Sequence, residues 1–306
     1  HIVAADGRGG SSTDVFARVF STTAGGTPQA VSGDVLVNAT VSGTQILSTY
    51  SSAKEVAGLP DGGFVVTWQS DYQDGDSHYY NIYGQRFDES GSSVGDEFMV
   101  NADRTVRAQH QPSVAGLDNV EFGVTWGDEA TNSRSSELGS GFDNSGWAVF
   151  GQKFTMVSGT EDDTPVTNGD LFQVNTHTSG TQNDATVTSL GSDGFVVTWQ
   201  SANQDGSGYG IYGQMFNAAG AEQGSEFRVN TYTSGHQYDP SVTALNDGSF
   251  VVTWEDQTQD GSNYGIYGQH FNADGSKATE AKLVGGSADE TLVFDAAQSG
   301  IAIDLG

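Results

Sequence analysis

Residues 240–271 read PSVTALNDGSFVVTWEDQTQDGSNYGIYGQHF. A close copy begins at residue 185 and reads ATVTSLGSDGFVVTWQSANQDGSGYGIYGQMF, and another begins at residue 55 and reads EVAGLPDGGFVVTWQSDYQDGDSHYYNIYGQRF. A degenerate copy begins at residue 112 and carries an insertion, 128–147, between its VTW and FGQKF segments. The chain is therefore a tandem repeat, and a repeat of this period determines the architecture before any single motif does.

Each unit divides into four short strands bounded by turn residues, of the kinds PSVTAL, FVVTWQ, GIYGQxF and EFxVN. In the second strand Phe250, Val252 and Trp254 share one face, while Val251 and Thr253 share the other. Both faces are apolar, so each sheet needs a neighbour on either side. This requirement is typical of a propeller blade.

The sequence therefore predicts an all-β fold, a β-propeller of about five four-stranded blades that forms a single domain over residues 1–306. The first unit aligns only from its second strand, HIVAAD standing where FVVTWQ stands elsewhere. We expect a C-terminal strand, within 291–295 or 301–305, to complete that blade and close the ring. The alternative is an open array of β-sandwich modules. The expected units are 1–40, 41–102, 103–176, 177–231 and 232–286, followed by 287–306 as a closing strand or tail.

Composition limits the classes of function. Lys and Arg number 11 against 39 Asp and Glu, a formal charge of −28, so phosphate backbones are repelled and we expect no nucleic-acid partner. No apolar run approaches the roughly 20 residues of a membrane span, so we expect no membrane insertion. The chain has no Cys, which excludes disulfides and thiolate metal sites. Its carboxylates favour Ca²⁺, a cation that binds oxygen ligands.

The repeat resembles one found in very large secreted proteins of the RTX type, which include type I secretion substrates and adhesins and carry the unit near calcium-binding β-roll repeats. The resemblance covers about residues 15–271. The tail GGSADETLVF is similar to a worn Gly-Gly-x-Gly-x-Asp nonapeptide, from which Ser287 and Glu290 depart. The resemblance implies an extracellular or cell-surface location, calcium and membership of a longer chain. It implies no reaction.

The loops between the second and third strands alternate carboxylates with glycine. Such a loop can direct several oxygens at one Ca²⁺. Asp-Gly is also common hairpin chemistry, because glycine accepts the positive φ that other residues resist, so a turn role stays open. The candidate calcium ligands are Asp71, Asp74, Asp76, Asp205 and Asp260.

Aromatic residues beside these loops can stack on the apolar face of a sugar, while nearby amides bind its hydroxyls. Repetition would make such a protein multivalent. The alternative is that the tyrosines pack between sheets. The candidate ligand-binding residues are Tyr79, Tyr80, Tyr209, Tyr264, Gln73, Gln204 and Gln259.

An enzyme would need carboxylates that break the repeat. The position after the repeat Trp offers such a break, with Glu255 in the last unit and Asp6 at the aligned point of the first. Ring closure would bring these two units together, so Asp6 and Glu255 could act as acid and base in glycoside cleavage. The alternative is two solvated carboxylates at strand ends.

The leading interpretation is a secreted, non-enzymatic binding module, lectin-like or adhesive, that recognises extracellular glycans or cell-surface partners with calcium present. One alternative is a secreted polysaccharide-degrading enzyme, a hydrolase or lyase, with its site at the central channel. Another is a structural spacer or surface-layer component. The enzyme predicts carboxylates converging at the axis, whereas the lectin predicts equivalent shallow pockets around the rim.

Overall fold

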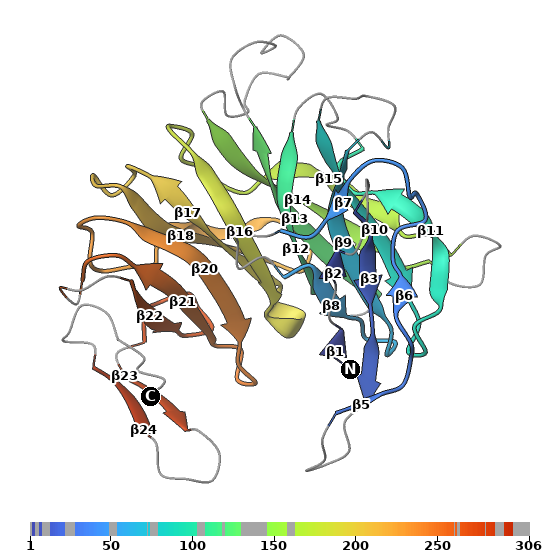
Figure 1. The fold of residues 1–306 in the computed structure, drawn as a ribbon. Helices are drawn as coiled ribbons and strands as arrows, with labels where there is room; N and C mark the ends of the chain where they lie inside the picture. Colours follow the sequence, from blue (N-terminus) through green and yellow to red (C-terminus); the bar gives the residue numbers. More distant parts are fainter. Residues whose placement is uncertain are drawn as a thin grey trace.

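The chain forms a succession of antiparallel sheets arranged in an arc (Figure 1). The all-β prediction is confirmed: the one helix among the described residues is the short 3₁₀ turn η1 (Gly191–Asp193). No described helix has the length and hydrophobicity of a membrane span. The computed structural model describes residues 13–21, 28–48, 54–71, 73, 79–102, 108–117, 120–129, 146–157, 163–259, 261 and 264–278, and the backbone of the strands at 2–3, 6–7, 280–284 and 291–295.

The second, third and fourth blades each contain the four expected strands in sequential order. In the second blade the first strand is divided into two short pieces. The second blade contains β7 (Gln45–Ile46), β8 (Val56–Gly58), β9 (Phe64–Asp71), β10 (Tyr80–Phe87) and β11 (Ser93–Met99). The third contains β12 (Gln109–Gly116), β13 (Glu121–Glu129), β14 (Trp147–Thr155) and β15 (Val166–Gln173). The fourth contains β16 (Gln182–Ser189), β17 (Phe195–Ala202), β18 (Tyr209–Phe216) and β19 (Glu222–Arg228).

In the described residues the fifth blade has three strands, and the first blade has six short strands in two three-stranded sheets. The first blade consists of short pieces, β1 (Ile2–Val3) with β4 (Val19–Ser21) and β5 (Gln29–Ala30), and β2 (Asp6–Gly7) with β3 (Val15–Ala17) and β6 (Val35–Leu36). The fifth blade consists of β20 (Gln237–Ala244), β21 (Phe250–Asp256) and β22 (Gly265–Phe271).

One of the two candidates for the closing strand, 291–295, does not close the ring. Segment β24 (Thr291–Asp295) pairs with β23 (Glu280–Val284) in a separate hairpin and not with the first blade. Figure 1 shows β1 and the β23–β24 hairpin on opposite sides of the opening in the arc. The expectation for 291–295 is therefore wrong, because local hairpin pairing replaces the long-range pairing. The other candidate, 301–305, lies outside the described residues.

Apolar side chains of neighbouring blades meet in four buried clusters, one at each junction. Between the fourth and fifth blades, Ile211 and Met215 of β18 pack against Phe250, Val252 and Trp254 of β21. The repeat tryptophans are buried at each junction: Trp68, Trp126 and Trp199 are fully enclosed and Trp254 nearly so. Full burial of a large apolar side chain contributes roughly 2 kcal/mol, so these junctions hold the arc together.

Glycine in the third strand makes room for an aromatic ring of its own blade. Gly213 pairs with Phe227 of β19, and a Cβ on Gly213 would lie 2.7 Å from the Phe227 ring. The same ring stacks at an angle on Phe250 and Phe271 of the next blade. Gly213 therefore lets the fourth strand contribute to the junction core.

Each linker between complete blades is held by a buried Asn–Gln pair. Asn175 Oδ1 accepts the Val149 N–H at 2.8 Å, and its Nδ2 donates to Gln182 Oε1 at 3.2 Å. Asn101 with Gln109 and Asn230 with Gln237 make the same pair. All six side chains are buried, so each amide satisfies backbone and side-chain groups that water cannot reach.

The first strands surround a common axis. Successive first strands β12, β16 and β20 contact one another, and the Ser113 hydroxyl accepts the Val187 N–H at 3.3 Å. Lys54, in the second blade, donates from Nζ to the Val242 carbonyl of the fifth. A hydrogen bond between blades two and five places both beside the same axis, as a propeller requires.

We expect the Asn–Gln pair to be needed for stability. Replacing Asn175 by Ala leaves the Val149 N–H and the Gln182 carbonyl buried without partners, at a cost of about 2 kcal/mol. Urea unfolding followed by tryptophan fluorescence measures this, with Ser225→Ala on the exposed face of β19 as control. Equal midpoints for the two variants would contradict a structural role for the pair.

Candidate functional site

A β-bulge lies at the start of each complete first strand. In β20 the register with β21 shifts between Tyr238 and Ser241, so Asp239 and Pro240 together oppose Trp254. The equivalent bulges in β12 and β16 lie at Gln111 and Asp184. These three residues have positive φ, 57° for Gln111, 54° for Asp184 and 49° for Asp239. Bulges of this kind re-aim side chains and are frequent beside active sites.

The residue after the repeat Trp supports the bulge of the following blade. Gln69 Oε1 accepts the Gln111 N–H at 3.2 Å, and Gln200 Oε1 accepts the Asp239 N–H at 3.1 Å. Two blades depart from this pattern. The third has Gly127, where a Cβ would lie 3.4 Å from the Trp147 ring, and the fifth has Glu255.

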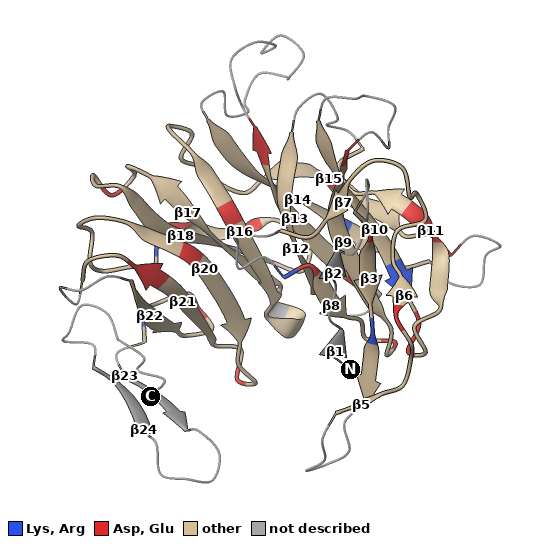
Figure 2. Ribbon diagram, in the orientation of Figure 1, with Lys and Arg blue, Asp and Glu red and all other residues tan. Residues whose placement is uncertain are grey.

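Three carboxylates interact at the inner strands of the fourth and fifth blades. Asp184 is 6% exposed, accepts from the Gln111 amide and accepts from Asn183 Nδ2 at 2.9 Å. Burial, reinforced by the Asp239 carboxylate, raises the pKa of Asp184 to about 7. Burial and the Glu255 carboxylate raise the pKa of Asp239 as well. Figure 2 shows the acidic segments on β16 and β21.

Tyrosines from the same two blades complete this group. Burial and the Asp184 carboxylate raise the pKa of Tyr209, and burial raises that of Tyr238, with further contributions from Tyr264, Tyr209 and Asp239. Tyr264 is 58% exposed, so the group opens to solvent. We call these residues the acid–tyrosine cluster: Asp184, Asp239, Glu255, Tyr209, Tyr238 and Tyr264.

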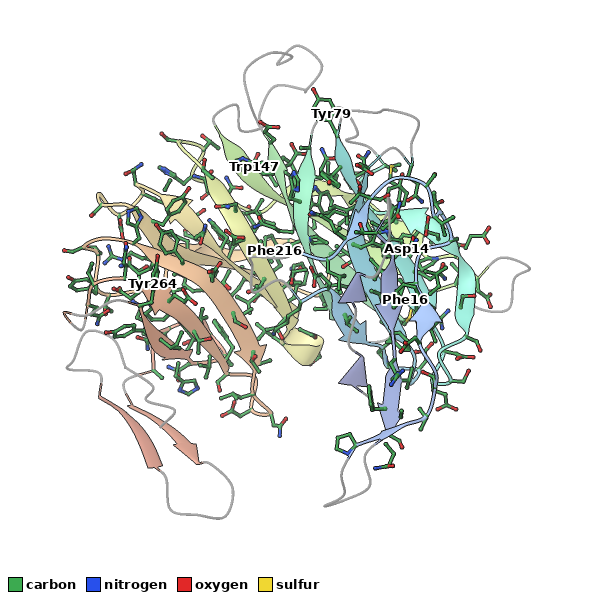
Figure 3. The ribbon with its side chains drawn as sticks, viewed as in Figure 1. Asp14, Phe16, Tyr79, Trp147, Phe216 and Tyr264 are labelled. Atoms are coloured by element: carbon green, nitrogen blue, oxygen red, sulfur yellow. The ribbon has the colours of Figure 1, made fainter. Side chains whose placement is uncertain are left out.

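A second group of aromatic rings lies at the same ends of the strands in the second and third blades. His110 lies between Tyr80 and Trp147, with 5.2 Å between ring centroids on each side. Tyr238 lies 5.5 Å from Tyr209. Figure 3 shows Trp147 at the upper edge of the blades and Tyr264 at the left edge. The aromatic residues of both groups lie at the starts of first and third strands, and we call them together the aromatic arc: Tyr80, His110, Trp147, Tyr209, Tyr238 and Tyr264.

The predicted ligand-binding residues divide into two groups. Tyr80, Tyr209 and Tyr264 belong to the aromatic arc, and Tyr79 is 38% exposed beside it. The glutamines are engaged in the fold: the amides of Gln73 and Gln204 donate to Glu97 and Glu226 of the fourth strands. The Gln259 N–H donates to Asp256 Oδ1 at 2.9 Å.

The two candidate calcium ligands that the structure describes, Asp71 and Asp205, accept hydrogen bonds from nearby residues. Asp71 Oδ1 accepts the Thr44 N–H, and Asp205 accepts the Ser207 N–H at 3.2 Å and Asn230 Nδ2 at 3.4 Å. Within the described ranges no group of three acidic or histidine side chains is arranged to hold a metal ion. Hydrogen bonds from turn residues are what the turn role predicts, and calcium binding stays a prediction. Asp74, Asp76 and Asp260 lie outside the described residues.

The proposed acid and base, Asp6 and Glu255, do not hold equivalent positions. Asp6 pairs with Phe16, whose counterpart in the fourth blade, Tyr212, pairs with Trp199. Asp6 therefore stands at the tryptophan position, one residue away from the alignment that the sequence suggested. Successive residues of a strand belong to opposite faces, so a shift of one residue changes the face. The carboxylates that interact with Glu255 are Asp239 and, through it, Asp184.

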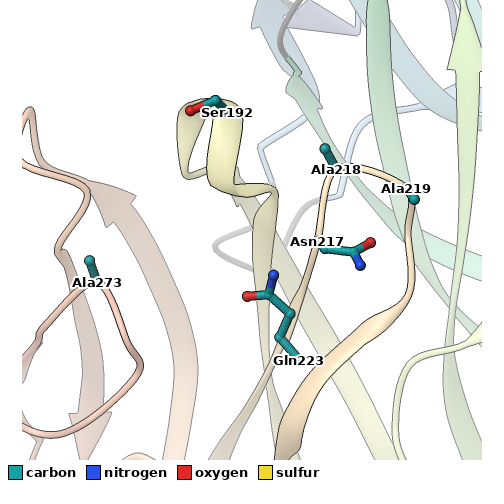
Figure 4. Close-up of a pocket in the computed structure, with 6 residues that line it drawn as sticks. All are labelled: Ser192, Asn217, Ala218, Ala219, Gln223 and Ala273. Carbon is teal, nitrogen blue, oxygen red and sulfur yellow. The ribbon is translucent and has the colours of Figure 1, made fainter.

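A cavity of about 470 Å³ lies at the other end of the fourth and fifth blades (Figure 4). It adjoins the turn after β18, whereas Tyr209 begins that strand, so it is separate from the aromatic arc. Small side chains and two amides line it, and no charged group does. The lining residues are Ser192, Asn217, Ala218, Ala219, Gln223 and Ala273.

Comparison with known proteins gives likeness in fold at low identity. No family model and no curated protein matches the chain. An α-L-arabinofuranosidase from Lactobacillus brevis is 12% identical, with TM-score 0.43, over 74% of this chain and 73% of that one. An endo-arabinase from Bacteroides thetaiotaomicron is 11% identical, with TM-score 0.41, over 85% and 97%. A mutant levansucrase from B. megaterium is 8% identical, with TM-score 0.43, over 81% of each. Likeness this remote carries no information on activity.

The buried carboxyls predict a fall in stability as pH rises. Asp184 and Glu55, each with a pKa raised to about 7 chiefly by burial, hold protons in the folded state that the unfolded chain releases near pH 4. The free energy of unfolding should therefore decrease between about pH 4 and 7. In Asp184→Asn the decrease should be smaller, and smaller again with Glu55→Gln added. Urea unfolding at a series of pH values tests this, and parallel curves for all three proteins would contradict it.

Proposed function

We propose that the chain binds carbohydrate along the aromatic arc, with the acid–tyrosine cluster at one end of the binding surface. The observation that carries this proposal is the succession of partly exposed rings at the starts of the inner and third strands, from Tyr80 to Tyr264. Such rings stack on the apolar faces of sugars, and neighbouring hydroxyl, amide and carboxylate groups bind sugar hydroxyls.

The arrangement favours one extended site over separate equivalent pockets. The Tyr80–His110 contact crosses the junction of blades two and three, and the Tyr209–Tyr238 contact crosses the junction of blades four and five, so the rings are shared between neighbouring blades. The blades also differ in their bulge residues, Gln111 against Asp184 and Asp239. An extended oligosaccharide fits this surface better than repeated single sugars do. The extracellular location, the adhesive role and calcium stay predictions from the resemblance.

A second candidate function is glycoside cleavage at the acid–tyrosine cluster. Asp184 has a pKa of about 7 and is buried beside Asp239, which in turn interacts with Glu255. Unequal protonation of neighbouring carboxyls is the requirement for general acid and general base in one site. The axial convergence of carboxylates expected for an enzyme supports this candidate.

Removal of exposed rings should weaken binding without unfolding the chain. Tyr264→Ala and Trp147→Ala should each raise the dissociation constant of a bound oligosaccharide about tenfold, because a stacking contact contributes about 1 kcal/mol or more. Glycan-array screening identifies the ligand, and calorimetry measures the variants. Val166→Ala, at an exposed position of the outer strand β15, serves as control. An array without signal for the folded wild-type chain would refute the proposal.

Cleavage is tested separately on the ligands that bind. If the acid–tyrosine cluster is catalytic, release of reducing sugar should fall at least about a hundredfold in Asp184→Asn, because an amide cannot donate a carboxyl proton, while binding persists. Reducing-end assays on the wild-type and variant chains provide the measurement. Binding with no release by the wild-type chain would exclude the enzyme and leave the binding module.

A further inference from the structure

The charge of the aromatic surface specifies the ligand more narrowly. Asp239 and Glu255 are partly buried. The pKa values of Asp184 and Asp239 are raised by burial and by neighbouring carboxylates, and no basic side chain is among the causes. A ligand that covers these carboxylates removes their water. Desolvating an ionised carboxylate is costly unless the ligand supplies a compensating charge or hydrogen bonds.

Four of the described basic side chains are engaged away from the cluster. Arg18, Arg86 and Lys153 pair with acids of their own blades, Asp34, Asp61 and Glu121. Lys54 donates to the Val242 carbonyl, and burial is the cause that lowers its pKa. In the described part of the chain no Lys or Arg forms an ion pair with Asp184, Asp239 or Glu255, and the His236 ring stacks on Tyr238 beside them with 5.1 Å between ring centroids.

Tyrosine faces add a second attraction for positive charge. A cation over an aromatic ring is stabilised by the negative face of the ring, and quaternary and primary ammonium groups are recognised in this way. The rings of Tyr209 and Tyr238 lie 5.5 Å apart, and Tyr238 pairs with Glu255 across β20 and β21, so these rings lie beside the carboxylates. The chain as a whole carries a formal charge of −28, which attracts cations and repels anions over a longer range.

We infer that the carbohydrate recognised by this surface is a cationic one, a polymer of amino sugars with free ammonium groups, seated with its amines on the acid–tyrosine cluster. This inference rests on the proposed function. It excludes uronic-acid and sulfated polysaccharides, whose charges would meet Asp239 and Glu255. Rings bind the sugar faces, and the carboxylates select the amines.

The test compares two ligands with the same sugar backbone, one with free amines and one with the amines acetylated. Calorimetry on the full chain near neutral pH measures a glucosamine tetrasaccharide against its N-acetylated counterpart. The cationic ligand should bind at least about tenfold more tightly, and added salt should reduce the difference. Asp239→Asn should abolish the preference and retain binding of the acetylated ligand, since Asn tolerates the positive φ. Glu222→Gln, an exposed site on β19, removes the same charge and should change nothing.

The outcomes separate the inference from the proposal beneath it. Equal affinity of the two tetrasaccharides for the wild-type chain would overturn the cationic inference and leave carbohydrate binding standing. Equal effects of Asp239→Asn and Glu222→Gln would overturn it too, since net charge would then explain the preference. An oligolysine of equal charge that binds as tightly would refute the role of the sugar. Binding of neither saccharide would end the proposed function itself.

Discussion

The sheets of the second, third and fourth blades bury apolar side chains on both faces, and the arrangement of the blades follows from the need to cover them. A four-stranded sheet of this size cannot bury two faces by itself. At the junction of the fourth and fifth blades Ile211 and Trp254 come from different blades, and neither would be buried without the other's sheet. The repetition of that junction generates the arc, and the axis is the line along which the first strands meet.

Covering the faces also shapes the functional surface. In the third, fourth and fifth blades the tryptophan opposes two residues of the first strand, and at these bulges Asp184 and Asp239 have positive φ. Their carboxyl groups interact because β16 and β20 are neighbours at the axis. The raised pKa of Asp184 is thus a consequence of the same packing that holds the blades together. The proposed binding surface and the blade packing therefore involve the same few residues, as is common where strain is stored at a site.

The repeat predicted the blades and part of the site. The strand boundaries, the buried tryptophans and the tyrosines at the third strands could be read from periodicity, since each copy reports the same environment. Asp184 and Asp239 were missed, although they recur as Gln-x-Asp before the first strand's apolar run. A carboxylate in that position resembles any polar strand end until the bulge is seen. His110 was missed because its contact with Tyr80 crosses the junction of the second and third blades, and Trp147 was missed because it meets His110 across a strand of the same sheet.

The sequence by itself determined the all-β class, the strand order within a blade and the faces that must be buried, because alternation and turn residues act over a few positions. Only the tertiary structure decided which carboxylates interact, the register that puts Asp6 at a tryptophan position, and the pairing of β24 with β23. These depend on how separate blades are positioned about the axis, and on competition between local and distant strand pairing. Neither is encoded within a single repeat unit.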